Sequence, residues 1–357
     1  MPSTPEDLKH TSTTGNLQPS GENHRVATPE KQTISIVLPC VNEEESILEL
    51  YSRLINVCDK LKQYDFVFQF VDNASTDSTV DKIKALADKD DRVKAILNSR
   101  NFGFARSPFY GMLQAEGDCV ILLATDLQEP PELIPDFIDL WKSGMSVVVG
   151  QKTSSDEPIA MYFLRSLFYK AMGAMSEVPL LQHVTGFGLY DRRVIEIFKS
   201  LNEPIPYTRG LITEIGLPYT VVPYKQATRQ KGKTKFNFFR LFDYAMLAVT
   251  SYAKAPMRVA TFTGFVMSLL SFLGALSVIG IKLFYWKENV PVGYASGIVA
   301  MFFLASIQIF LLGLVGEYLL ATMTYVRRRP LVVENGRVGK WQNNPLESST
   351  SNALAGK

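Results

Sequence analysis

Two long apolar runs in the C-terminal third restrict what this 357-residue chain can fold into. Val259–Ile281 and Gly293–Gly316 are each longer than twenty residues and contain no Asp, Glu, Lys or Arg. A helix of that length spans the roughly 30 Å hydrocarbon layer of a membrane. A buried core helix is the alternative, but two consecutive runs favour the membrane. The sequence therefore predicts two transmembrane helices, at about 259–281 and 293–318, within a membrane region of residues 257–326.

Basic residues flank the pair of runs at both outer ends. Lys254 and Arg258 precede the first run, and Arg327–Arg329 follow the second. Because positively charged flanks stay on the cytoplasmic side, we expect both termini and the catalytic domain in the cytoplasm. The chain is thus predicted to be an integral protein of the inner (cytoplasmic) membrane with a cytosolic C-terminal tail, residues 327–357.

The rest of the chain divides into a tail and a folded domain. Residues 1–31 are rich in Ser, Thr, Pro, Glu and Lys and have almost no aliphatic run, which predicts a disordered tail without the apolar core of a signal peptide. From Thr33, short β-branched runs alternate with amphipathic stretches. This alternation predicts an α/β domain over residues 32–235, with a mostly parallel sheet covered on both faces. The expected strands are Ile34–Leu38, Phe66–Val71, Val93–Leu97 and Cys119–Leu123, and the expected helices are Glu44–Leu61, Ser78–Ala87 and Arg106–Ala115.

The segment that joins this domain to the first apolar run, residues 236–256, is amphipathic. Aromatic and aliphatic residues dominate Phe236–Ala253, and Lys235, Arg240 and Lys254 lie at its edges. This pattern predicts a helix in the membrane interface, with an ordinary packed helix of the soluble domain as the alternative. Either arrangement keeps the domain close to the bilayer, within reach of a lipid substrate.

Composition excludes several classes of function. The net charge of +2 offers no general basic surface for nucleic acid, so no nucleic-acid partner is expected. Cys40, Cys58 and Cys119 are odd in number and lack CxxC spacing, which argues against a disulfide framework and fits a reducing cytosol. Three histidines leave no His/Cys zinc site.

Polar residues follow the predicted strands, at the sheet edge where ligands of parallel sheets bind. Pro39, Asp72, Arg100 and Asp126 fall there. In an extended segment residues two apart point the same way, so Asp126 and Gln128 are expected to direct a carboxylate and an amide oxygen to one spot. Both groups are suitable ligands for Mg²⁺ or Mn²⁺. Water and diphosphate oxygens would complete the coordination shell of the ion. Alone, such a pattern more often marks a solvated turn or a helix N-cap.

Four motifs occur in order: IVLPCVNEE (Ile36–Glu44), VDNASTD (Val71–Asp77), RNFG (Arg100–Gly103) and TDLQ followed by PPEL (Thr125–Leu133). Together they resemble glycosyltransferase family 2, specifically the polyprenyl-phosphate glycosyltransferases related to dolichol-phosphate mannose synthase and bactoprenol glucosyltransferases. The resemblance covers about residues 33–330. It implies a GT-A (Rossmann-like) fold and a hexosyltransferase that uses a nucleotide-sugar donor and a polyprenyl phosphate acceptor.

The resemblance also implies roles for single residues. Asp126 is the expected catalytic residue and, with Gln128, the expected ligand of Mg²⁺ or Mn²⁺. The residues expected around the nucleotide are Pro39, Val41, Glu43, Asp72, Thr125 and Asp126. A carboxylate such as that of Asp72 can accept the ring N–H of uracil or guanine, although a turn or capping acid is an equal alternative there.

A basic loop, Arg229–Lys235, resembles the family motif R-x-x-G-x-[ST]-K. Arg229, Thr234 and Lys235 are accordingly expected to bind a phosphate of the nucleotide or of the lipid. Attraction to anionic lipid headgroups is the simpler alternative. Arg165 and Lys170 are further candidates for the acceptor phosphate, or plain surface charges.

The chain departs from the family pattern at three positions. Ala124 stands where many relatives have Asp, Gly186 where they have the proposed base Asp, and Gly188 where they have an acceptor-binding Arg. A phosphate acceptor tolerates the missing base, because its second pKa is about 6 and its oxygen is anionic at neutral pH. Attack then needs positioning and leaving-group stabilisation more than deprotonation.

The leading hypothesis is an inverting, metal-dependent transfer from a UDP- or GDP-sugar to polyprenyl phosphate at the cytosolic membrane face. A processive polysaccharide synthase is one alternative, although Gln230 stands where such enzymes carry the Trp of Gln-x-x-Arg-Trp. A catalytically inactive nucleotide-sugar-binding membrane protein is another. Relatives often assemble through their membrane segments, so a homo-oligomer is expected, with Glu317 able to pair across such an interface.

Overall fold

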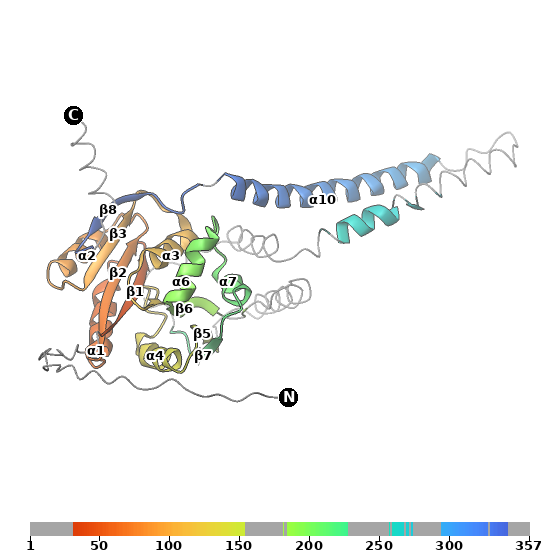
Figure 1. Ribbon diagram of the computed structural model, residues 1–357. Helices are drawn as coiled ribbons and strands as arrows, with labels where there is room; N and C mark the ends of the chain where they lie inside the picture. The colour runs from red at the N-terminus through yellow and green to blue at the C-terminus, as the bar shows by residue number, and fades with distance from the viewer. Residues whose placement is uncertain are drawn as a thin grey trace, which may run out of the picture. The chain divides into compact units, whose positions relative to one another are not determined.

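The computed structural model describes residues 31–153, 181, 184–227, parts of 257–273, 294–327 and 329–341 (Figure 1). In this part of the chain one sheet has the strand order β7-β5-β6-β4-β1-β2-β3-β8. The strands are β1 (Gln32–Cys40), β2 (Tyr64–Asp72), β3 (Val93–Asn98), β4 (Cys119–Leu122), β5 (Val147–Lys152), β6 (Val184–Asp191), β7 (Tyr219–Tyr224) and β8 (Glu334–Val338). The helices are α1 (Ile47–Cys58), α2 (Thr79–Ala87), α3 (Gly103–Gln114), the short 3-10 turn η1 (Pro131–Leu133), α4 (Ile134–Lys142), α6 (Arg192–Leu201), α7 (Thr208–Glu214) and α10 (Tyr294–Val326).

The sheet is mixed but mostly parallel. Strands β4, β1, β2 and β3 pair in parallel, as do β5 and β7, whereas β6 runs antiparallel to both β4 and β5. The α/β class and the mostly parallel sheet predicted from the sequence are confirmed. Each strand and helix expected between residues 33 and 123 is present, with ends that differ by a few residues.

Alternation along the strands separates two apolar cores, one on each face of the sheet. Ile36 of β1 lies in a buried cluster with residues of α1, α2 and α4, whereas its neighbour Val37 lies in a second cluster with residues of α3, α6 and α7. Successive strand residues point to opposite faces, so one β-branched run serves both cores. Each fully buried aliphatic side chain stabilises the fold by about 1.5–3 kcal/mol.

Helix α6 begins at a capping carboxylate. Asp191 Oδ1 accepts the backbone N–H of Arg193 at 2.8 Å, and its Oδ2 accepts the indole N–H of Trp141 at 2.7 Å. The helix ends at Asn202, which adopts the left-handed conformation common after a final helical turn. Asp191 therefore has a structural role that joins α6 to α4.

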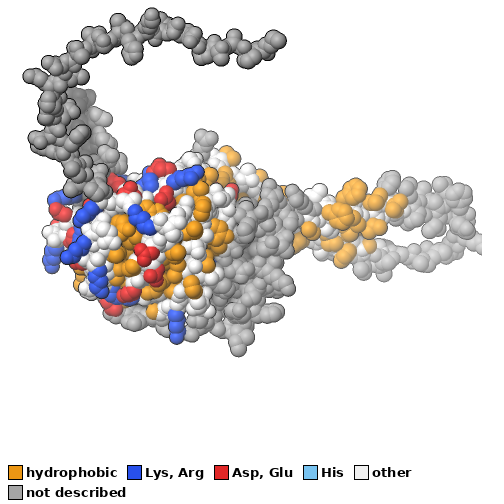
Figure 2. Space-filling model, turned by 60° about the horizontal axis from the view of Figure 1, so that its bottom comes forward, with side chains coloured by type: hydrophobic (Ala, Val, Ile, Leu, Met, Phe, Trp, Pro, Cys, Tyr) orange, Lys and Arg blue, Asp and Glu red, His pale blue; other side chains and the backbone are white. Residues whose placement is uncertain are grey.

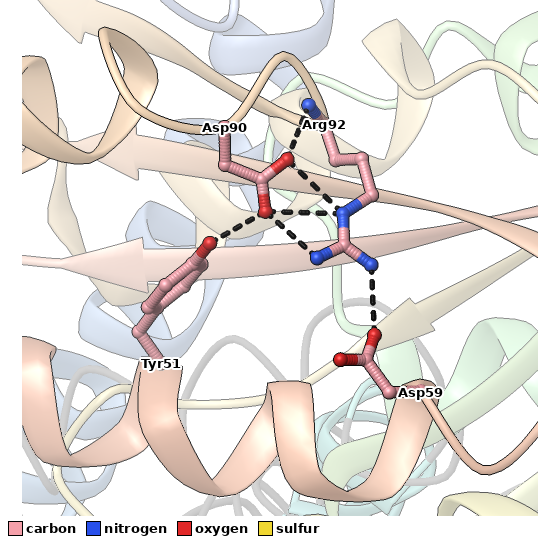
Figure 3. A network of polar contacts seen from close by, with 4 residues as sticks. All are labelled: Tyr51, Asp59, Asp90 and Arg92. Carbon is pink, nitrogen blue, oxygen red and sulfur yellow. Dashed lines mark hydrogen bonds and ion pairs between the residues drawn. The ribbon is translucent and has the colours of Figure 1, made fainter.

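Basic and acidic side chains are interspersed on the face of the molecule that Figure 2 shows. A network joins α1 to the start of β3 (Figure 3): Arg92 bonds Asp90 at 2.8 Å and Asp59 at 3.1 Å, and the Tyr51 hydroxyl donates to Asp90 at 2.6 Å. Partial burial alone would raise the pKa of Asp90, but the hydrogen bonds from Arg92 and Tyr51 outweigh it and lower that pKa. The ionised carboxylate is thus the form that the fold favours.

A strand from beyond α10 completes the sheet. Strand β8 pairs antiparallel with β3, and its Arg337 forms a 2.7 Å ion pair with Glu334, whose side chains are 3% and 8% exposed. Tyr110 of α3 donates a 2.7 Å hydrogen bond to Glu334. The sequence placed residues 327–357 in a tail and ended the domain at 235. Strand β8 escaped prediction because its residues, ENGRV, have no apolar alternation and are held by polar contacts.

Helix α10 is predominantly apolar, and Glu317 is the charged residue within it. Its segment Phe303–Val326 is the one candidate membrane span among the described residues, and side chains such as Ile309 and Phe310 are both 71% exposed. This helix contains the second predicted span. The first, 259–281, is described only as parts of a helix before residue 274 and stays a prediction. The predicted tail and interfacial helix, residues 1–30 and 236–256, lie outside the described residues.

Candidate active site

A pocket of about 390 Å³ lies at the carboxyl ends of the parallel strands. Residues at or after the ends of β1, β4 and β5 line it, together with the start of β6, the first turns of α3 and residues of α7. Because β6 runs antiparallel to β4, its beginning reaches the same edge as the ends of its neighbours. Asn73, after β2, and Gln226, after β7, also line it, so the topology gathers residues from many segments around one space.

Asp126 and Gln128 both line this pocket, but the extended geometry predicted for them is wrong. They occupy a turn, in which Leu127 has a φ of 62° and the Gln128 N–H donates to Asp126 Oδ1 at 3.2 Å. Leu127 is buried, whereas the residues on either side are half-buried. The turn thus brings both polar side chains to the pocket by packing Leu127 inward, and no strand continues through them.

The chemistry of this pair fits a hard divalent cation. The Gln128 amide nitrogen donates to the carbonyl of Ala227 at 3.4 Å, and the other atom of this amide is an oxygen, which, like the Asp126 carboxylate, is a ligand type that such cations prefer. No group of three or more His, Cys, Asp or Glu side chains suited to a metal occurs in the described residues. A metal role for Asp126 and Gln128 stays a prediction.

The pocket includes all but one of the predicted nucleotide-binding residues. Pro39, Val41 and Glu43 line it, and the buried hydroxyl of Thr125 donates to the Pro39 carbonyl at 2.9 Å. Asp72 does not line it: this side chain is 2% exposed and accepts the backbone N–H of Ser75 at 3.1 Å. These contacts are those of a turn acid, and a role for Asp72 at the nucleobase stays a prediction.

The RNFG motif is held to the pocket by a buried amide network. The Asn73 side chain donates to Asn101 Oδ1 at 3.1 Å, and the Asn98 side chain donates to Asn73 at 3.2 Å and to Ser107 at 2.9 Å. The Phe102 N–H also donates to Asn73, at 2.8 Å. The network fixes where α3 begins, and α3 forms one wall of the pocket.

Sequence reasoning missed Glu129. This side chain is 5% exposed; its Oε2 accepts the Ala124 N–H at 2.9 Å and its Oε1 accepts the Thr185 hydroxyl at 2.7 Å. Burial raises the pKa of Glu129 to about 7, against the lowering effect of these two hydrogen bonds. Nothing in the sequence separates Glu129 from an ordinary turn acid ahead of Pro130, because its partner lies 56 residues away.

Sequence reasoning also missed two cations in the pocket wall. Lys152 ends β5 and Arg209 belongs to α7, and both line the pocket. A Lys point charge and an Arg fork are suited to phosphate oxygens. Neither residue belongs to a recognisable motif, so only the folded chain places them in the same pocket as Asp126.

The structure supplies a packing reason for Gly188. A Cβ at this position would lie 2.3 Å from the carbonyl oxygen of Val148 and 2.8 Å from the Cα of Val149. An arginine therefore cannot be accommodated here while β5 and β6 stay paired. At Gly186 the space is open, with only Leu122 within 4 Å, but its φ of +99° is one that side-chain-bearing residues rarely adopt.

Five predicted phosphate-binding residues lie outside the described part of the chain, and their roles stay predictions. They are Arg165, Lys170, Arg229, Thr234 and Lys235.

Comparison with known proteins decides the family. Residues 35–198 match the model of Glycosyl transferase family 2, and residues 255–321 match that of the GtrB C-terminal hairpin. An uncharacterized glycosyltransferase of Synechocystis is 34% identical over 84% of this chain and 93% of its own length. The chain belongs to glycosyltransferase family 2. Its motifs from Ile36 to Leu133 lie within the matched region, so the resemblance inferred from them is confirmed.

Two other relatives have more specific names. The prophage bactoprenol glucosyl transferase homolog of Escherichia coli is 32% identical, and the bactoprenol glucosyl transferase of Shigella phage SfII is 34% identical. Each alignment covers 83% of this chain and 96% of the relative. This family 2 member is therefore a glycosyltransferase with a GT-A-like domain.

Among solved structures, glucosyl-3-phosphoglycerate synthase from Mycobacterium tuberculosis matches with a TM-score of 0.40 and 20% identity, over 61% of this chain and 78% of that one. A similarity this distant has no bearing on the substrates of the present chain.

Proposed function

We propose that this glycosyltransferase transfers a sugar from a UDP- or GDP-linked donor to a polyprenyl phosphate at the cytosolic face of the membrane. The observation that carries the proposal is the pocket, in which the Asp126–Gln128 turn shares one space with Lys152 and Arg209. The donor diphosphate and the acceptor phosphate are both anionic. Lys152 and Arg209 can bind phosphate oxygens directly, and Asp126 and Gln128 can bind them through a divalent cation. The bactoprenol glucosyl transferases related to this chain support the lipid acceptor.

Each group of pocket residues has a distinct task in this proposal. Pro39, Val41 and Glu43 bind the nucleoside end of the donor, next to the turn. Asp126 and Gln128 hold Mg²⁺ or Mn²⁺, which when bound neutralises charge on the departing nucleoside diphosphate. Lys152 and Arg209 orient phosphate oxygens in the same pocket.

The reaction is a single displacement with inversion. An anionic oxygen of the lipid phosphate forms a bond to the anomeric carbon while the bond from that carbon to the diphosphate oxygen breaks. No proton has to leave the nucleophile, because a phosphate monoester is already ionised at neutral pH. Gly186, which cannot act as a base, is compatible with this acceptor, and catalysis depends on positioning and on electrostatic stabilisation.

The apolar surface of α10 supports a membrane location for the transfer. Its exposed aliphatic and aromatic side chains are suited to lipid, and the residues match a family hairpin over 255–321. We propose that both apolar runs span the inner membrane with both termini in the cytoplasm. Self-assembly through this hairpin, including a role for Glu317, belongs to the same proposal.

The test is a donor screen with the purified full chain in lipid nanodiscs. Undecaprenyl phosphate, Mg²⁺ or Mn²⁺ and a panel of UDP- and GDP-sugars are incubated with the protein, and lipid products are identified by mass spectrometry. We expect one donor to add a single sugar to the lipid phosphate and none to add sugar to undecaprenol, which lacks the phosphate. Transfer of several sugars would indicate a processive synthase. Metal-dependent stabilisation by UDP or GDP without any product would indicate a binding protein and overturn the proposal.

A further inference from the structure

The side chain of Glu129 closes the turn that contains Asp126 and Gln128. Its Oε2 accepts the N–H of Ala124, so one hydrogen bond of 2.9 Å joins the residue before the turn to the residue after it. The carboxylate is 5% exposed yet borders the pocket. Both ends of the segment that holds the two proposed metal ligands are thus fixed by one side chain.

The turn needs such support because its centre is strained. Leu127 has a φ of 62°, in the left-handed region, which is unfavourable for a side-chain-bearing residue and persists only where surrounding contacts impose it. Leu127 itself is buried, and the Gln128 N–H to Asp126 bond of 3.2 Å is long. The Glu129 contact, at 2.9 Å, is shorter and joins the two ends of the turn.

The second oxygen of Glu129 connects the turn to the other side of the pocket. Its Oε1 accepts the hydroxyl of Thr185, at the start of β6, at 2.7 Å. Positions 124 and 186, which lie beside the two contacts, have no acidic side chain in this chain. The Glu129 carboxylate bridges the residue that follows β4 and the start of β6 through its two oxygens.

We propose that Glu129 is a positioning residue, which holds the Asp126–Gln128 pair at a set distance from the β6 wall through its bond to Thr185. The inference rests on the proposed function, since it assumes that this pair holds a divalent cation. Glu129 does not ligate the cation in this proposal. It acts through the turn, and Thr185 is the partner through which it reaches β6.

The test compares Glu129→Gln, Thr185→Val and Thr185→Ser with the wild-type full chain. Thermal unfolding is followed across a Mn²⁺ series with saturating UDP or GDP, and kcat and donor KM are measured in the transfer assay. The amide of Glu129→Gln can accept only one of the two bonds, and Thr185→Val removes a hydroxyl at nearly constant shape. Supporting groups of this kind change metal affinity or activity by about 10–100-fold.

We expect the Mn²⁺ concentration at half-maximal stabilisation to rise by about 10–100-fold in Glu129→Gln and Thr185→Val, and kcat to fall with little change in donor KM. Thr185→Ser should recover most of the loss. The matched control is Thr213→Val, whose hydroxyl bonds the Gly210 carbonyl within α7 at 3.0 Å, and which should leave the Mn²⁺ response unchanged. A purely structural role for Glu129 would lower the melting temperature without moving the Mn²⁺ midpoint.

The outcomes separate this inference from the proposed function. Suppose that the wild type forms glycosylated lipid and that Glu129→Gln has the same Mn²⁺ midpoint and the same kcat as the wild type. The positioning role is then wrong and the proposed function stands. If the wild type forms no lipid product but the midpoint still moves in Glu129→Gln, the function is wrong and the positioning role stands. A wild type whose unfolding does not respond to Mn²⁺ at all overturns the positioning role.

Discussion

The two halves of the sheet build the pocket in different ways. Strands β1 to β4 pair in parallel, and the residues at their ends belong to motifs that were recognisable in the sequence, such as Pro39 and Asp126. In the other half, β6 pairs antiparallel with β4 and β5, β5 pairs parallel with β7, and Gly186 and Gly188 stand where we expected an Asp and an Arg from the sequence. The difference teaches that short sequence motifs describe the half proposed to bind the donor, here called the donor half, whereas backbone packing shapes the half proposed to bind the acceptor, here called the acceptor half.

The sharpest test of the donor half is Asp126→Ala. Loss of a metal-holding carboxylate should reduce kcat by about 10³-fold or more, equal to about 4 kcal/mol in the transition state, without unfolding the chain. Asp191→Ala is the matched change in the other half: it removes a helix cap, should cost about 1 kcal/mol of stability, and should retain turnover. Transfer assays and melting curves check both. Turnover lost in Asp191→Ala and kept in Asp126→Ala would reverse the roles assigned here.

In the acceptor half, Gly188→Ala should be strongly destabilising. The added Cβ would meet the Val148 carbonyl oxygen at 2.3 Å, so β5 has to move away from β6, at a cost of about 3 kcal/mol. Gly188→Arg should therefore lower the melting temperature without improving transfer. Gly216→Ala has open space around it and a φ of +67°, and should cost about 1 kcal/mol. Equal melting temperatures for Gly188→Ala and Gly216→Ala would contradict this packing argument.

The outer edge of the donor half depends on a buried ion pair. Arg337→Met leaves the Glu334 carboxylate buried without its cation, and should destabilise the fold by about 3 kcal/mol. The double variant Arg337→Met with Glu334→Gln should regain part of the lost stability, because the unpaired charge of Glu334 is gone. Lys340→Ala, which breaks the exposed pair with Asp91, should leave the melting temperature unchanged. A similar loss in Lys340→Ala would mean that β8 is held by surface charge instead.

The smallest expected effect concerns the Asp90 network shown in Figure 3. Burial opposes ionisation of Asp90, but the bonds from Arg92 and Tyr51 prevail, so its folded pKa lies below its unfolded pKa of about 3.9. Such a group contributes stability above the unfolded pKa and loses it as pH falls through the folded pKa. The melting-temperature difference between wild type and Asp90→Asn should be constant from about pH 5 to 7 and shrink below about pH 4. A constant difference down to pH 2.5 would show that charge is not its source.

Sequence periodicity predicted the local elements of the donor half well. The expected strand Ile34–Leu38 lies inside β1, and the expected helix Ser78–Ala87 nearly coincides with α2. The prediction from sequence was wrong at Asp126–Gln128, where we expected an extended segment and the structure has a turn. The left-handed φ of Leu127 cannot be inferred from a leucine, because tertiary contacts impose that conformation.

The sequence by itself determined the α/β class, the family and the apolar helix α10, because each depends on local periodicity, ordered motifs or continuous hydrophobicity. Only the tertiary structure decided that β8 pairs with β3, that Glu129 meets Thr185, and that Lys152 and Arg209 face the same pocket as Asp126. These contacts join residues distant in sequence, and residue type alone does not specify such partners. Packing selects them, through the burial and hydrogen bonding of the whole domain.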